Sequence, residues 1–195
     1  MDLKTMLNML AVFQTAAALG MLVANRKQVS YRGFGLWTLA FFLMALGITL
    51  ISQRGQIAPF LSILVANAMI LGAIAVFHQG THLFFKLPGR SPLLFDALVM
   101  AATLIALLPL VPTPPGVALT SRTLAIASGM FLLCVHAGVR PLFHKRTSFG
   151  LWLHSIGLIL LALYNLYRLA FALHADTGLY DEQLLWKSNM VWGAT

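Results

Sequence analysis

The sequence predicts an all-α, polytopic transmembrane helical bundle with six spanning helices and the start of a seventh. Of its 195 residues, 59% are hydrophobic and only 9% are charged, and the mean hydropathy is +0.85. A soluble domain has about 45–50% apolar and about 25% charged residues, so a water-soluble fold is excluded. The apolar runs are continuous and reach the roughly 20 residues that a spanning helix needs. Strands of a membrane barrel would instead alternate in short segments.

The six apolar runs cover 5–24, 34–52, 57–79, 92–111, 119–139 and 148–172. Short turns rich in helix breakers separate them. The first run follows Asp2 and Lys4 and lacks a clear small-residue cleavage site, so we interpret it as a spanning helix rather than a signal peptide. A seventh run begins near Trp186 and the chain stops at Thr195 before it could cross. We therefore expect residues 1–195 to form one transmembrane domain, cut from a longer protein whose next part is cytoplasmic.

Basic residues predict the orientation of the bundle. The loops at 25–33, 80–91 and 140–147 carry eight of the thirteen Lys and Arg residues. Loops rich in these residues stay in the cytoplasm, which predicts an N-terminus outside the cytoplasm; in a bacterial inner membrane this would be a periplasmic N-terminus. The same loops account for the net charge of +8, so we expect membrane lipid and no nucleic acid among the partners.

Polar side chains recur at helical spacing inside the apolar runs. Asn67 and His78 lie 11 residues apart, as do His154 and Asn165, and three helical turns place each pair on one face. Polar groups inside a membrane mark candidate sites. The periplasmic end of this polar seam predicts a ligand-binding site made of Arg54, Asn67, Arg122, Asn165 and Arg168. Arginine pairs well with carboxylate or phosphate groups. The alternative is that these arginines reach lipid headgroups or pair with Asp176 or Asp181.

The cytoplasmic end of the seam collects histidines. His78, His136 and His154 lie at similar depth, as two axial ligands of a b-type haem must. They are the metal-ligating candidates, and the cofactor is otherwise unknown. The alternative is ordinary hydrogen-bonded histidines near helix ends, with His82 in a basic loop. Asp96 is the one carboxylate within an apolar run, which disfavours a proton-coupled transporter.

One segment carries a family resemblance. It runs from Trp37 to Gly72 and reads WTLAFFLMALGITLISQRGQIAPFLSILVANAMILG. This segment resembles the N-terminal multi-helix membrane sensor domain of proteobacterial GGDEF-type diguanylate cyclases. The features in common include the Arg54-Gly55 turn, Pro59 and Asn67, and the loop LFFKLPGR at 83–90 is also similar. The resemblance is good over roughly 30–90 and loose afterwards, and the three histidines are not part of the family pattern.

The resemblance implies a sensory input domain that detects a small-molecule signal and regulates the GGDEF domain of the same polypeptide. It implies a homodimer, because such cyclases form their active site between two GGDEF domains. This chain would itself not be catalytic, whereas the full-length protein would make cyclic di-GMP. The alternatives are a membrane b-type cytochrome or haem-based redox or gas sensor, a small transporter and a purely structural anchor.

Overall fold

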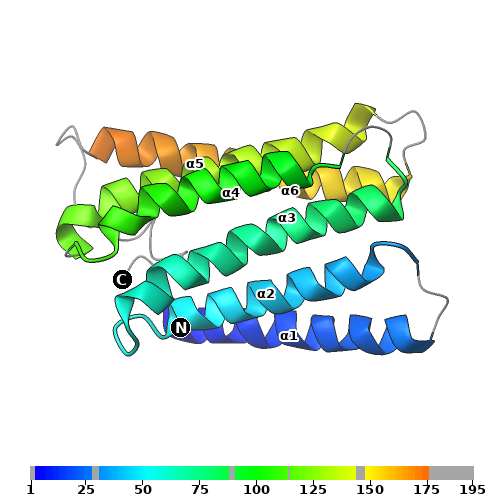
Figure 1. Ribbon diagram of the computed structural model, residues 1–195, viewed down its shortest axis with the longest axis horizontal. Helices are drawn as coiled ribbons and strands as arrows, with labels where there is room; N and C mark the ends of the chain where they lie inside the picture. Colours follow the sequence, from blue (N-terminus) through cyan, green and yellow to red (C-terminus); the bar gives the residue numbers. More distant parts are fainter. Residues whose placement is uncertain (1–2, 28–30, 88–90, 114, 144–147, 176–195) are drawn as a thin grey trace.

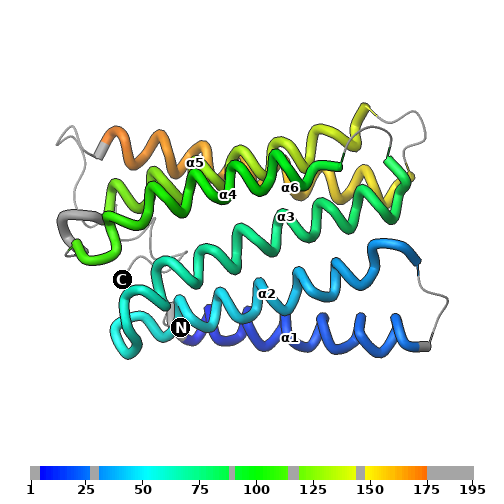
Figure 2. The backbone as a smooth tube through the Cα atoms, viewed as in Figure 1, coloured from blue at the N-terminus to red at the C-terminus, as the bar shows by residue number. Residues whose placement is uncertain are grey.

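The computed structural model describes residues 3–27, 31–87, 91–113, 115–143 and 148–175, which form six long helices packed side by side (Figures 1 and 2). Every one of these helices is long and apolar enough to cross a membrane. The predicted fold class is therefore confirmed. In chain order the elements are α1 (Leu3–Lys27), α2 (Phe34–Ser52), the π-helical turn η1 (Phe60–Val65), α3 (Ala66–Phe84), α4 (Leu93–Leu107), the 3-10 turn η2 (Leu108–Leu110), α5 (Pro115–Val139), the 3-10 turn η3 (Arg140–Phe143) and α6 (Phe149–Ala175).

The third helix differs most from its predicted limits of 57–79. It begins with η1 directly after Pro59, a residue that suits the first turn because that turn needs no amide donor there. It then continues through His82 to Phe84, so the placement of His82 in a loop was wrong. Leu83 and Phe84, the apolar residues after His82, extend α3 past this histidine. The predicted features at 88–90, 144–147 and 176–195, including the seventh helix near Trp186, lie outside the described residues.

The bundle consists of two halves of three helices each. The most extensive contacts join α1 with α2, α2 with α3 and α5 with α6, while α3 meets α4 and α5 across the seam between the halves (Figure 1). Successive helices run in opposite directions. The turn after α2, the start of α5 and the C-terminal part of α6 therefore share one end of the bundle, at the left in Figure 1. We name it the arginine end because these segments carry Arg54, Arg122 and Arg168. The opposite end, where α3 and α5 finish and α6 begins, carries His78, His136 and His154 and is named the histidine end.

Small residues let neighbouring helices approach closely. At Gly47 of α2, a Cβ atom would lie 2.7 Å from Cγ1 of Ile70 and 2.9 Å from the carbonyl oxygen of Ala66. This is the small-residue packing that membrane helices use, because apolar burial alone does not drive their association in lipid. Large apolar side chains such as Leu98 and Leu160 are correspondingly exposed on the outside of the bundle, where acyl chains would cover them.

Candidate functional site

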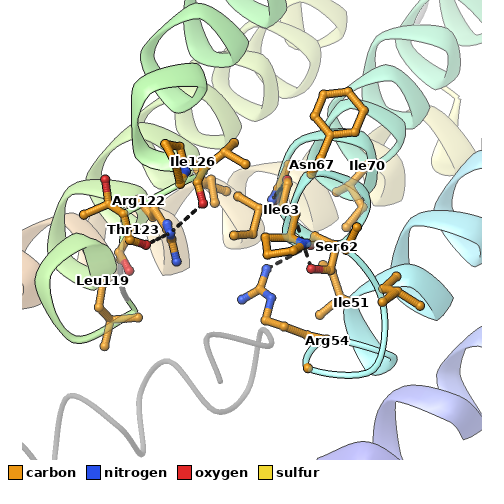
Figure 3. Close-up of a pocket in the computed structure, with 18 of the residues that line it drawn as sticks. Ile51, Arg54, Ser62, Ile63, Asn67, Ile70, Leu119, Arg122, Thr123 and Ile126 are labelled. Carbon is orange, nitrogen blue, oxygen red and sulfur yellow. Dashed lines mark hydrogen bonds between the residues drawn. The ribbon is translucent and has the colours of Figure 1, made fainter.

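A cavity of about 700 Å³ opens at the arginine end, between the two halves of the bundle (Figure 3). Four of the five residues predicted to bind a ligand line it, and they come from both halves. Arg54 and Asn67 belong to the α2–α3 side, whereas Arg122 and Arg168 belong to α5 and α6. Asn165, the fifth, is not among the lining residues.

Arg54 lies in the turn that joins α2 to η1. Gly55, with φ of +86°, allows the chain to reverse there. Nη2 of Arg54 donates a hydrogen bond of 3.0 Å to the carbonyl oxygen of Ser62, inside the π-helical turn. Burial and, secondarily, the positive charge of Arg122 lower the pKa of Arg54 to about 10, so this guanidinium is charged at neutral pH but sits in an environment that favours an anion.

Arg122 faces the cavity from α5 and also holds the 3-10 turn η2 and the segment just after it, at the end of the fourth helix. Its Nε donates to the carbonyl oxygen of Leu110 at 3.1 Å, and its Nη2 donates at 2.6 Å to Leu110 and at 2.6 Å to Thr113. The last carbonyls of a helix have no partner within the helix and carry partial negative charge. Part of the hydrogen-bonding capacity of Arg122 is therefore structural, which the sequence-based interpretation did not anticipate.

Arg168 lies on α6 and is only 7% exposed. Its Nε is buried and has no hydrogen-bond partner among the described residues. One turn earlier, Asn165 donates at 2.9 Å to the carbonyl oxygen of Leu161. The Nδ2 group of Asn165 is thus used within its own helix, while its Oδ1 is buried without a hydrogen-bond partner among the described residues, and the residue does not line the cavity.

Asn67 and Ser62 complete the polar wall on the α3 side. Nδ2 of Asn67 donates at 2.6 Å to the carbonyl oxygen of Ile63, so this side chain and Arg54 both hold carbonyls of the π-helical turn η1. Turns of this kind leave backbone groups irregularly placed and are often found at functional sites. Figure 3 shows Arg54 and Arg122 reaching toward the cavity from opposite sides.

The described walls of the cavity carry three guanidinium groups and no carboxylate. Asp96 is the one acidic residue within the described part of the chain, and it lies near the histidine end. Asp176 and Asp181, the alternative partners for the arginines, lie outside the described residues. The remaining walls are largely apolar, with Ile51, Ile63, Ile70, Ile126 and Met130 among them. This combination suits a small amphipathic anion, whose carboxylate or phosphate meets the arginines and whose apolar body meets the isoleucines.

At the histidine end, two of the three predicted ligands meet. The rings of His78 and His136 contact each other edge to face with their centroids 4.8 Å apart. The two axial imidazoles of a haem lie on opposite faces of the macrocycle, so rings in direct contact leave no room for a haem between them. His154 instead lies against Phe77, with ring centroids 5.2 Å apart. The pairing of His78 with His136 therefore does not fit a b-type haem.

The sequence-based analysis left Asp96 out of the candidate sites. In the structure, Nδ1 of His78 donates to one oxygen of this carboxylate at 2.8 Å, and Nδ1 of His136 donates to the other at 2.9 Å. Asp96 is 0% exposed. In the sequence, the feature that could have indicated a site is a carboxylate in the first turn of an apolar helix. Only the packing of α4 against α3 and α5 shows that both histidines reach this carboxylate.

The fold and the cavity define a multi-pass membrane protein of helical-bundle class with a cationic pocket at one end. Comparison with protein-family models, with curated proteins and with solved structures gives no match to this chain. The resemblance of residues 37–72 to sensor domains therefore stays a hypothesis.

Proposed function

We propose that this chain is a membrane-embedded sensory input domain that binds a small amphipathic anion in the cavity at the arginine end. The observation that carries the proposal is the convergence of Arg54, Arg122 and Arg168 on one largely apolar cavity. The regulated partner, a C-terminal diguanylate cyclase that makes cyclic di-GMP, is proposed from the resemblance of residues 37–72 to domains that precede GGDEF domains.

The position of the cavity suggests how binding becomes a signal. Its arginines belong to both halves of the bundle, so an anion held by Arg54 on one side and Arg168 on the other draws the halves together. A ligand shifts a conformational equilibrium only when it binds the two states differently. A site shared by the two halves of the bundle meets that condition, because its geometry changes when one half moves against the other. Arg168 lies on α6, the last described helix, which would pass the movement to a following output domain in a homodimer.

Binding to the purified chain in detergent tests the first half of the proposal. The probes are octanoate, benzoate and inorganic phosphate, which separate the need for an apolar body from the need for an anionic head. We expect octanoate to raise the melting temperature and Arg168→Gln to weaken this binding at least tenfold. The matched control is Arg32→Gln, which removes an exposed arginine near the histidine end. Equal weakening in both variants would show that the effect is general charge attraction, and the site assignment would fall.

Cyclic di-GMP production by the full-length protein tests the second half. We expect Arg168→Ala to change the output at unchanged expression, because the variant loses ligand-dependent movement and keeps the cyclase. Arg122→Ala should act in the same direction. Unchanged output in both variants removes the arginines from signalling, and the absence of any cyclic di-GMP production rejects the proposed output domain.

A further inference from the structure

Three side chains from three different helices meet near the histidine end of the bundle. His78 comes from α3, Asp96 from the first turn of α4 and His136 from the last turn of α5. One ligand atom from each of the three lies within 4.8 Å of the other two. Among the described residues this is the one group of histidine, cysteine and acidic side chains that converges in this way.

The charge of Asp96 requires a positive partner. Its side chain is 1% exposed, and the side chains of His78 and His136 are 1% and 26% exposed. Within the described ranges, its ion partners are these two histidines alone. A buried carboxylate is costly unless a cation or a proton balances it. A proton on one of the imidazoles or a bound divalent cation supplies that balance, and the cation alone engages all three side chains at once.

The donor set selects the kind of cation. Two imidazole nitrogens with one carboxylate form the ligand set of zinc and non-haem iron sites, whereas Mg²⁺ and Ca²⁺ prefer oxygen ligands alone. An ion about 2.0–2.2 Å from each ligand separates nitrogen from oxygen by about 3.0–3.4 Å. The two rings bond to different oxygens of Asp96, at 2.8 Å from His78 to Oδ2 and 2.9 Å from His136 to Oδ1. An ion that replaces the Nδ1 protons would widen these two separations by about 0.1–0.6 Å.

We propose that His78, Asp96 and His136 bind one divalent first-row transition-metal ion, with zinc as its test ion. The site clamps α3 of one half to α4 and α5 of the other, at the end of the seam opposite the arginine cavity. Access is from the side of His136, whose side chain is the most exposed of the three. The metal proposal does not rest on the proposed anion site, since the two sites share no residue.

The test uses the full chain, purified in detergent, treated with EDTA and then mixed with an equimolar amount of ZnCl₂. After gel filtration we expect about one zinc per chain by elemental analysis, together with a raised melting temperature that MgCl₂ does not produce. CoCl₂ should give visible d–d absorption without a near-ultraviolet thiolate band, because the buried Cys134 is not a ligand. A chain that holds no zinc after this treatment overturns the proposal and leaves a proton to balance Asp96.

The variants assign the ligands. Asp96→Asn keeps the shape of the side chain and removes its charge, so zinc binding should weaken at least tenfold, and His136→Gln should do the same. His154→Gln is the matched control, since it removes a histidine of the same end that is outside the converging group. Loss of zinc in His154→Gln equal to that in Asp96→Asn overturns the ligand assignment. Where Asp96→Asn fails to fold, His136→Gln decides, because that side chain is partly exposed.

Discussion

Replacing Arg168 by methionine is expected to stabilise the protein in the absence of ligand. The guanidinium is buried and its Nε has no hydrogen-bond partner among the described residues. A buried polar group left in this state costs about 1–3 kcal/mol, and methionine fills a similar volume with apolar atoms. The free energy of unfolding should therefore rise by about 1–3 kcal/mol, which corresponds to an increase of roughly 2–10 °C in the melting temperature.

The same substitution at Arg122 is expected to have the opposite sign. Arg122→Met removes hydrogen bonds to the carbonyl oxygens of Leu110 and Thr113, the shortest of them 2.6 Å long. Hydrogen bonds to a charged group contribute about 1.5–3 kcal/mol each and are not additive, so the loss should be about 2–4 kcal/mol. Thermal unfolding of both variants in one detergent, without added anion, measures the two shifts side by side.

A lower melting temperature for Arg168→Met would refute the argument that this arginine is held ready for a ligand. It would mean that an acidic side chain outside the described residues already pairs with it. Asp176→Asn and Asp181→Asn then identify the partner, because the variant that removes it should abolish the effect of Arg168→Met. A stabilised Arg168→Met that no longer binds octanoate would show a trade of stability for binding, as functional sites often do.

Three further expectations follow from other contacts. Gly47→Val should cost about 1–3 kcal/mol in thermal unfolding, because even the first added carbon would lie 2.7 Å from Cγ1 of Ile70; an unchanged melting point would contradict the close packing of α2 on α3. Gly80→Ala should displace Trp37, whose Cδ1 would lie 2.6 Å from the new carbon, and shift the tryptophan fluorescence. Anion binding should be constant from pH 7 to 9 and weaken as pH rises through about 10, where Arg54 loses its proton; Arg54→Gln should remove that weakening. Because burial lowers the pKa of Arg54 to about 10, the folded state binds fewer protons than the unfolded state as pH rises above about 10, so stability itself should rise with pH there.

The helices and the arginine cavity were largely predictable from the sequence. A run of about 20 apolar residues determines a spanning helix almost regardless of its neighbours, because no other structure satisfies the backbone in lipid. The alternation of short turns then places Arg54, Arg122 and Arg168 at one end. Helical spacing predicted which face each residue occupies, and four of the five ligand candidates do line one cavity.

What the sequence did not reveal depends on which helices are neighbours. Asn165 was expected in the cavity because of its spacing, yet its amide bonds within its own helix. Arg122 was expected to face a ligand, but η2 and the segment after it lie close enough to take several of its hydrogen bonds. The role of Asp96 depends on α4 packing against both α3 and α5, and a spacing along one helix carries no information about that arrangement.

The seam between the two halves of the bundle has a consequence for what the molecule can report. The anion cavity and the proposed metal site lie at its two ends, and each takes residues from both halves. Two sites that bias the same rigid-body equilibrium are coupled, and the coupling free energy is the same in both directions. Under the two proposals, the chain would act as a coincidence detector, in which occupancy of the metal site at one end of the bundle sets the sensitivity to an anion at the other end.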